Sequence, residues 1–255
     1  MNFSMALHKY NDFADKFSKF GSDSLHNESV VESLKDWSEL ETIDSIKVWF
    51  QEEQEKCLMS VENISLMDCS GWLYNEEKGY IEHDSGEFFY VQGIRVKNTD
   101  DREVECGWDQ PIITQVGYNG GLLGLLRKKI NSIPYYLVNL KAEPGNPDKI
   151  QISPTLQATF SNLKRAHKGK KPKFSEFFET PELVGGKVLF NQWMSEDGGR
   201  LYLKKNKGML VEIDDSVNLN GITSTYKWMT LYQIKFLIKE NSWVSPHVRS
   251  IISHL

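Results

Sequence analysis

The chain has 255 residues, 40% of them apolar and 25% charged, which is typical of one large or two small globular domains with a core of their own. A net charge of −5 argues against general binding to nucleic acid or anionic membranes, and no apolar run approaches the roughly 18 residues of a membrane span. Three cysteines without CxxC spacing and an N-terminus without a secretory signal favour a cytoplasmic protein.

The first 60 residues are predicted to form a helical arm. Residues 1–27 are polar with scattered aromatic side chains and form either a docked helical arm or a partly disordered segment. Two amphipathic helices follow at 29–40 and 42–57. Ser29 with Glu32 three residues later has the form of a capping box, and Thr42 opens the second helix. We therefore divide the chain into an arm, residues 1–60, and a single module, residues 61–255.

From residue 66 onward, short apolar runs separated by turns predict strands. We expect a strand at 87–96, a hairpin of strands 110–116 and 122–130, and a second hairpin around residues 206–208. Helices are predicted at 230–240, where Thr230 and Gln233 form a capping box, and after Ser245. Without a repeat or a linker, the pattern predicts one α+β domain with helices at both ends.

Two successive segments, 136–143 and 151–161, alternate apolar and polar side chains. Successive side chains of a strand point to opposite faces, so each segment is predicted to be a strand with one polar face. The polar face of the second consists of Gln151, Ser153, Thr155, Gln157, Thr159 and Ser161. Such a row of amides and hydroxyls favours many neutral hydrogen bonds to one polyhydroxylated ligand; the alternative is a solvent-exposed face chosen for β-propensity.

Other candidate residues lie in turns and on neighbouring strands. His83 and Ser85 precede Gly86, in either a close approach or a plain polar turn. Arg95 lies on an apolar strand side and needs a partner, which is an ion pair or a ligand. Gln110 flanks an apolar segment. The basic run 164–173 is either a solvated loop or a diphosphate site. With no dinucleotide fingerprint, P-loop or metal-ligand spacing, we expect neither cofactor nor metal.

Four motifs resemble those of the NDP-hexose 2,3-dehydratases. They are H-x-S-G-x-F-F-x-V-x-G-x-R-V at 83–96, Q-P-I-I-x-Q at 110–115, K-A-E-P-G-N at 141–146 and S-P-T-L-Q-A-T-F-S-N at 153–162. Segments around Glu196, Asn206 and 228–233 are similar too, whereas residues 1–60 carry no part of the resemblance. The resemblance implies a Nudix hydrolase-like mixed sheet with flanking helices that lacks the Nudix metal-binding box.

The resemblance also implies a reaction. Water is removed across C2–C3 of a nucleotide-linked 4-keto-6-deoxyhexose, of the dTDP-4-keto-6-deoxy-D-glucose type. The product is a 3,4-diketo sugar on the way to deoxysugars, and an NAD(P)H-dependent 3-ketoreductase is expected to consume it. Family members usually carry two such modules, so a single-module chain is expected to form a homodimer. The alternatives are a ketoisomerase on the same substrate and a non-catalytic nucleotide-sugar-binding subunit.

The expected site follows from this chemistry, which needs a base, a donor facing the enolate and a proton source at C2. We expect Glu143 to be the base, Lys141 the donor and His83 the second proton-transfer group, with the roles open to exchange; a structural Glu–Lys pair is the alternative. The residues expected to contact the substrate are Ser85, Arg95, Gln110, Gln115, Asn146, Gln151, Ser153, Thr155, Gln157, Thr159, Asn162, Arg165 and His167.

Overall fold

The structure is a computed structural model that describes residues 10–12, 15–16, 24–99, 104–118, 120–163 and 171–255. Four strands form a small sheet: β1 (Trp72–Asn75), β2 (Tyr80–His83), β3 (Phe89–Val96) and β4 (Trp108–Gln115). Seven form a large sheet: β5 (Gly121–Ile130), β6 (Ile133–Ala142), β7 (Ile150–Ser153), β8 (Leu156–Thr159), β9 (Gly186–Ser195), β10 (Lys205–Ile213) and β11 (Tyr226–Met229). The helices are α2 (Ser24–Leu34), α3 (Ile43–Lys56), α4 (Phe160–Leu163), α5 (Glu176–Glu179), α6 (Leu231–Leu237) and α7 (Pro246–Ile252), with short 3₁₀ helices at Leu66–Asp68, Val116–Tyr118 and Pro181–Val184.

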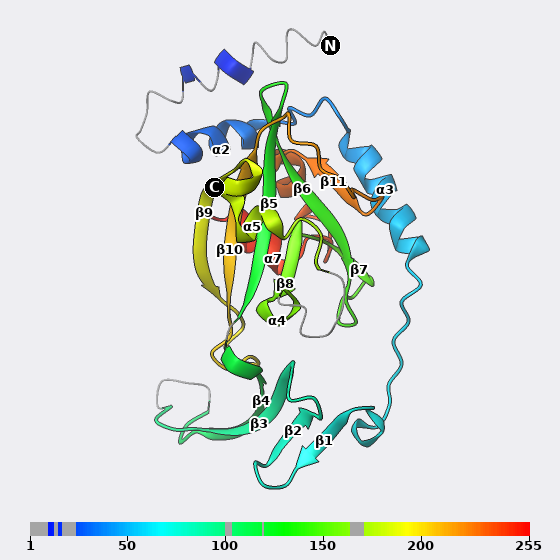
Figure 1. Cartoon of the computed structure of the whole chain (residues 1–255), viewed down its shortest axis with the longest axis vertical. Coiled ribbons are helices and arrows are strands. Elements are labelled where there is room, and N and C mark those ends of the chain that lie inside the picture. The colour runs from blue at the N-terminus through cyan, green and yellow to red at the C-terminus, as the bar shows by residue number, and fades with distance from the viewer. Residues whose placement is uncertain (1–9, 13–14, 17–23, 100–103, 119, 164–170) are drawn as a thin grey trace.

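The predicted α+β class is confirmed. The two sheets lie one after the other along the long axis of the molecule (Figure 1). The large sheet has the order β11-β6-β5-β10-β9, with β7 added to β6 and β8 to β5. Its strands pair antiparallel except β5 and β10, which run parallel. The segment between α3 and β1 runs down one side of the molecule and joins the two halves (Figure 1).

The core lies on both faces of the large sheet. In β5, Leu123 and Leu125 face the cluster formed with α3, α6 and α7, whereas Leu122 and Leu126 face the cluster that contains α5. A strand buried on both faces reads as a continuous apolar run, which explains the leucine-rich sequence of β5. Gly124 interrupts the leucines because the ring of Phe178 of α5 occupies the space that a side chain would need.

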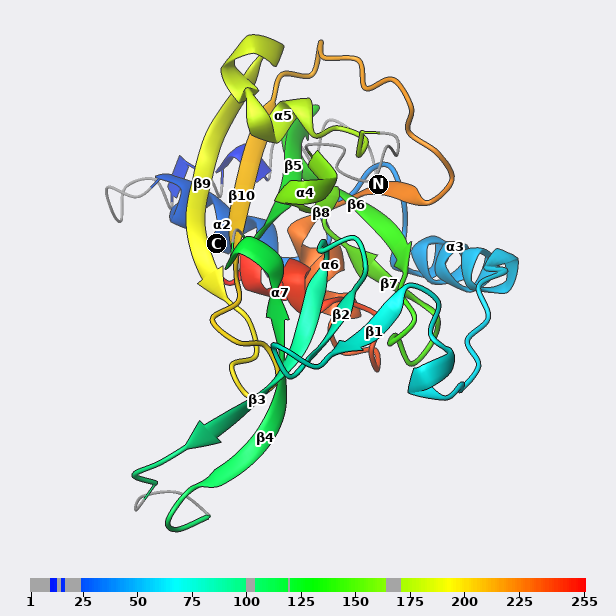
Figure 2. The same cartoon turned by 60° about the horizontal axis from the view of Figure 1, so that its bottom comes forward.

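The small sheet has almost no core of its own. Of the residues in β1–β4, all of which are described, only Ile112 and Thr114 are buried. The β3–β4 hairpin extends away from the rest of the molecule (Figure 2). Main-chain hydrogen bonds connect strand β4 of this hairpin to the large-sheet half: Ile113 N donates to Arg200 O (3.0 Å), and Tyr202 N donates to Ile113 O (2.8 Å).

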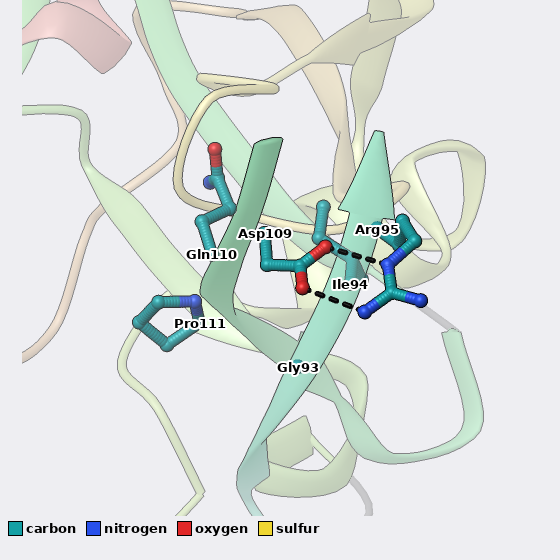
Figure 3. A pocket seen from close by; sticks show the side chains of 6 residues that line it. All are labelled: Gly93, Ile94, Arg95, Asp109, Gln110 and Pro111. Carbon is teal, nitrogen blue, oxygen red and sulfur yellow. Dashed lines mark hydrogen bonds and ion pairs between the residues drawn. The ribbon is translucent and has the colours of Figure 1, made fainter. Parts of the chain in front are cut away.

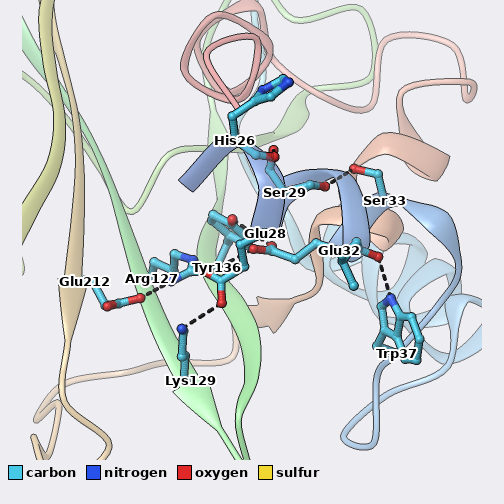
Figure 4. Close-up of polar contacts among 11 residues, drawn as sticks. His26, Glu28, Ser29, Glu32, Ser33, Trp37, Arg127, Lys129, Tyr136 and Glu212 are labelled. Carbon is cyan, nitrogen blue, oxygen red and sulfur yellow. Dashed lines mark hydrogen bonds and ion pairs between the residues drawn. The ribbon is translucent and has the colours of Figure 1, made fainter. Parts of the chain in front are cut away.

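Helix α2 is fixed to the large sheet by a buried charge cluster (Figure 4). The guanidinium of Arg127, on β5, is 1% exposed and pairs with Glu28 (2.6 Å) and Glu32 (2.9 Å) of α2 and with Glu212 of β10. Tyr136 donates a further bond to Glu32 (2.8 Å). Because a buried charge is tolerated only when it is paired, these contacts hold α2 in one position.

The N-terminal boundaries differ in part from the prediction. Helix α2 begins at Ser24, so the capping box at Ser29 is wrong: its hydroxyl donates to His26 O inside the helix, and Glu32 binds Arg127. The capped helix after Thr42 is confirmed. Helix α3 also packs into the core of the large sheet. The division of the chain at residue 60 stays a prediction.

The pairing of the strands differs from the prediction more than their positions along the chain do. Strands 110–116 and 122–130 belong to different sheets, and residues 205–213 are one continuous strand, so both predicted hairpins are wrong. The predicted strand 151–161 is two strands, because Pro154 interrupts it: β7 pairs with β6, and β8 pairs with β5. The helices that begin after Thr230 and Ser245 are confirmed, with the expected side-chain caps.

Candidate functional site

A cavity of about 210 Å³, here called the polar pocket, opens at the end of the large sheet where β5 and β10 begin. Amide, hydroxyl and charged side chains from five segments converge on it. They are Lys141, Gln157, Thr159, Asn162, Glu196, Lys204, Asn206 and His247, with Gly121, Leu123 and Ala158 completing the wall. Convergent polar groups of both charges in one cavity are typical of a site for a small polar ligand.

Glycine at position 121 keeps this pocket open. Gly121 is paired with Asn206 across the parallel strands β5 and β10. A Cβ atom on Gly121 would lie 2.8 Å from Asn206 Oδ1 and 2.9 Å from Ala158 O. Any larger residue would therefore push into the amide that faces the cavity.

Glu196 connects two other side chains of the polar pocket. Asn206 donates from Nδ2 to Glu196 Oε1, and His247 Nδ1 lies 3.7 Å from the same oxygen. His247 is in the first turn of α7, whose N-cap is Ser245. Burial lowers the pKa of His247 below the ordinary 6.5, although the charge of Glu196 acts in the opposite direction. The imidazole is therefore neutral at neutral pH and able to accept a proton.

Lys141 and Glu143, expected on one strand face, do pair: Nζ lies 2.7 Å from Oε1. Lys141 lines the polar pocket, and Glu143 contacts it through this ion pair without lining the cavity itself. Both lie close enough to His247 to influence its charge. The pair is thus part of the site's electrostatics, whichever of its members touches the substrate.

A second cavity of about 210 Å³, the apolar pocket, adjoins the first and shares Thr159, Asn162 and Lys204 with it. Its remaining walls are Phe88, Phe89, Ile113, Gln115 and Leu201. The ammonium of Lys204 donates to Gln115 Oε1, and Gln115 Nε2 donates to Gly120 O (2.9 Å). Burial lowers the pKa of Lys204. A partly desolvated cation therefore lies at the border of the two pockets.

Several residues predicted to bind the ligand instead bond to the main chain. Thr155 lies buried behind β5 and β6, accepting from Leu126 N and donating to Leu137 O. The others are Asn146, which donates to Lys141 O and Lys149 O, Gln151, which donates to Ser242 O, and Ser153, which donates to Gln151 O. These side chains stabilise the fold around the pocket.

None of the predicted residues of the small sheet lines the polar pocket. Gln115 lines the apolar pocket, and the other predicted residues of this sheet do not. His83 Nδ1 lies 2.7 Å from Ser85 Oγ and 3.1 Å from Asp84, which is a polar turn. Arg95 forms two 2.8 Å bonds with Asp109 in a separate open cavity of about 410 Å³ (Figure 3).

Gln110 lines that separate cavity as well and donates to Gly199 O (2.8 Å). The partner expected for Arg95 was an ion pair or a ligand, and in the structure it is an ion pair with Asp109. Arg165 and His167 lie outside the described residues.

Four side chains of the polar pocket were not predicted: Glu196, Lys204, Asn206 and His247. Glu196 and Asn206 belong to segments that carried the family resemblance, and this was the signal that could have found them. Lys204 and His247 carried no signal, because only the tertiary fold brings them to the ends of β5 and β8.

In the described part of the chain, no three His, Cys, Asp or Glu side chains lie close enough to hold a metal ion. None of the helices in the described ranges has the length and apolar character to cross a membrane.

The family model described as NDP-hexose 2,3-dehydratase matches residues 43–255. The chain belongs to the NDP-hexose 2,3-dehydratase family. The match begins at residue 43, so it includes α3, which the sequence had placed in the arm outside the resemblance.

Relatives named dTDP-4-dehydro-6-deoxy-alpha-D-glucopyranose 2,3-dehydratase come from three organisms. The Amycolatopsis orientalis protein is 33% identical over 83% of this chain and 44% of its own length. The Saccharopolyspora spinosa protein is 34% identical (72% and 36%), and that of Streptomyces violaceoruber 31% (81% and 45%). The chain therefore spans less than half the length of these 2,3-dehydratases.

Two solved structures are matched over about two thirds of this chain. An ADP compounds hydrolase is matched with a TM-score of 0.36 and 9% identity, over 65% of this chain and 83% of the hydrolase. A Nudix hydrolase from M. smegmatis is matched with a TM-score of 0.31 and 10% identity, over 64% and 97%.

Proposed function

We propose that this chain is a 2,3-dehydratase module that removes water across C2–C3 of a nucleotide-linked 4-keto-6-deoxyhexose, of the dTDP-4-keto-6-deoxy-D-glucose type, to give the 3,4-diketo sugar. The observation that supports this proposal is the polar pocket, where a neutral imidazole, a carboxylate and two ammonium groups converge within the segment that matches the family. The amides and hydroxyls of Gln157, Thr159 and Asn162 supply the neutral hydrogen bonds that a hexose needs.

The first step of the proposed reaction is removal of the C3 proton, which the C4 ketone acidifies. His247 accepts this proton, since burial keeps its imidazole neutral. Negative charge then develops on the C4 oxygen, and the ammonium of Lys141 donates to it. A fixed cation at the developing oxyanion lowers the barrier because its charge matches the transition state better than the ground state.

The second step is departure of the C2 hydroxyl. The imidazolium formed in the first step carries the proton that this hydroxyl needs to leave as water, and Glu196 stabilises the imidazolium until then. The C2–O bond breaks, the C2–C3 double bond forms, and the resulting enol relaxes to the 3,4-diketo sugar. The substrate loses one water, and no electron donor or acceptor enters.

Glu143, expected to be the base, holds Lys141 in this scheme through their 2.7 Å ion pair. The two roles differ in their consequences. A Glu143→Gln variant that loses about 10²–10⁴ of turnover with unchanged substrate affinity would make Glu143 the base, as the sequence suggested. If Glu143→Gln loses less turnover than Glu196→Gln or His247→Asn does, the result would support a positioning role for Glu143.

The test of the function is direct. The protein is incubated with dTDP-4-keto-6-deoxyglucose and an NAD(P)H-dependent 3-ketoreductase, the class of enzyme that we propose consumes the product. Mass spectrometry of the trapped sugar should show the loss of one water and the gain of the two hydrogens that the reductase adds. A reduced product that has kept this water would indicate a ketoisomerase, and binding without any turnover a nucleotide-sugar-binding subunit.

We also propose that two copies of the chain form an isologous dimer. The 2,3-dehydratase relatives extend over more than twice the length that this chain matches, and the small sheet and the segment before it expose apolar side chains such as Leu73 and Met67. Such a dimer should bury at least about 1,000 Å². Sedimentation at micromolar concentration tests it: a single-chain mass contradicts the proposal.

The three free cysteines support a cytoplasmic location.

A further inference from the structure

Part of the apolar pocket comes from a motif that the proposed reaction leaves without a role. The segment 83–96, one of the four motifs that carry the resemblance, contributes Phe88 and Phe89 to its wall. Phe88 has a φ of 70°, a conformation that bulky residues rarely adopt. The ring of His83 lies edge-on to it at 4.9 Å, and Trp72 lies 4.9 Å from Phe89. His83 and Trp72 thus support two phenylalanines that remain partly exposed to the cavity.

The chemistry of the combined cavity changes along its length. The polar pocket presents amides, hydroxyls and charges, whereas the apolar pocket presents two aromatic rings with Ile113 and Leu201. Lys204 belongs to both, and its ammonium is held at the border by Gln115. A ligand that fits has a hydroxylated end, an anionic middle and a flat apolar end.

A nucleotide sugar has that order: hexose, diphosphate, nucleoside. We propose that the apolar pocket is the nucleobase subsite of this protein and that Lys204 contacts the diphosphate. The identity of the ligand rests on the proposed function, which places the hexose in the polar pocket. Aromatic side chains bind bases by stacking on their faces, and a half-buried ammonium binds phosphate by a charge-assisted bond. His83 is a positioning residue here, because it contacts Phe88 and lines neither pocket.

This assignment gives the small sheet a function. Its strands have little core, but β3, β4 and the turn before β3 supply Phe88, Phe89, Ile113 and Gln115 to the cavity. The bridge between Ile113 and Leu201 fixes that wall against the large-sheet half of the molecule.

The experiment measures binding by titration calorimetry of the full chain with two probes, thymidine diphosphate and inorganic diphosphate. Phe89→Ala and Leu201→Ser should weaken thymidine diphosphate by at least about fivefold, the lower end of what base stacking contributes, and leave inorganic diphosphate within about twofold. Lys204→Met should weaken both probes. Tyr74→Ala, an exposed aromatic of the same sheet that lines neither pocket, is the matched control and should change neither.

The wild type gives a second measurement that needs no variant: nuclear Overhauser contacts between the thymine methyl group and phenylalanine ring protons are expected. Unchanged thymidine diphosphate affinity in both folded apolar-pocket variants, absence of these contacts, or failure of the wild type to bind thymidine diphosphate would overturn the subsite. A dimer that dissociates in Phe89→Ala while affinity is unchanged would assign the surface to a second copy instead. Failure of the proposed function is distinguishable, because then no water is lost although the binding pattern holds.

Discussion

The two sheets of this protein differ in what they contribute to it. In β5 of the large sheet, seven of ten residues are buried, and helices cover both faces. In the small sheet only Ile112 and Thr114 are buried. Burial of apolar area supplies most of the free energy of folding, so the large sheet stabilises the molecule. The small sheet is left with side chains that can contact a ligand or a second chain.

The same contrast separates two arginine–carboxylate pairs. Arg127 is surrounded by three carboxylates in the interior of the large-sheet half (Figure 4), whereas Arg95 and Asp109 pair in the open on the β3–β4 hairpin (Figure 3). The surface pair has better bidentate geometry, yet solvent screens it. Burial, more than hydrogen-bond geometry, therefore decides how strongly the stability of the protein depends on each ion pair.

The largest effect is expected at the two histidines, one in each half of the molecule. His247→Asn should lower kcat by about 10²–10⁴, because it removes the proposed base. His83→Asn should change kcat by less than about tenfold and act mainly on KM, since it supports the pocket wall without touching the reacting atoms. Steady-state kinetics with the coupled reductase measures both. Equal losses of kcat would mean that the small sheet takes part in the chemistry.

The next effect concerns stability. Arg127→Met should lower the free energy of unfolding by about 3–5 kcal/mol, because it leaves Glu32 and its neighbours buried without a counter-charge. Arg95→Met is the matched control and should leave the denaturation midpoint unchanged within error. Urea denaturation followed by circular dichroism gives both values. A loss below about 1 kcal/mol for Arg127→Met would mean that α2 separates from the sheet at little cost.

Two strand glycines give a smaller difference. A Cβ at Gly124 would lie 2.5 Å from the buried ring of Phe178, so Gly124→Ala should destabilise by about 1–3 kcal/mol. At Gly93 of β3 nothing lies within 4 Å of an added Cβ, so Gly93→Ala should be neutral or stabilising by up to about 1 kcal/mol. Thermal melts of the two variants, measured in parallel, check this. Destabilisation by Gly93→Ala would indicate that another chain covers the small sheet.

The smallest effect is a shift along the pH axis. In the proposed reaction the neutral imidazole of His247 is the reactive form, so kcat/KM should fall as the pH drops through its pKa, which burial places below 6.5. The charge of Glu196 raises that pKa, so Glu196→Gln should move the acid limb to lower pH. Asp109→Asn, far from the pocket on the hairpin, should leave the limb in place. A limb that moves upward in Glu196→Gln would contradict the assignment to His247.

Local features of the fold were predictable from the sequence. Thr42, Thr230 and Ser245 each cap a helix where the pattern placed one, because a cap depends on hydrogen bonds within three residues. Strand pairing was not predictable. The neighbours of β5 include β10, whose paired residues lie 85 positions away, and no local pattern specifies a partner at that distance.

The site was predictable to a similar extent. Gln157 and Thr159 line the polar pocket as the alternation indicated. Thr155 does not, because Pro154 separates β7 from β8 and turns that hydroxyl to the main chain of β5 and β6. His247 joins the pocket from the far end of the chain, through the packing of α7 on the large sheet. That packing is a property of the whole core, and a single sequence carries no sign of it.

The Arg127 cluster has a consequence for the order in which the protein is made. Its carboxylates come from α2 and β10, so the ring of charges closes only after residue 212 leaves the ribosome, 85 residues after Arg127. At about 5–20 residues per second this interval is roughly 4–17 s. Throughout it, one edge of β5 has no β10 to pair with, and an unpaired apolar strand edge is a template for another chain. The nascent protein is thus exposed to aggregation through this edge while residues 127–212 are synthesised.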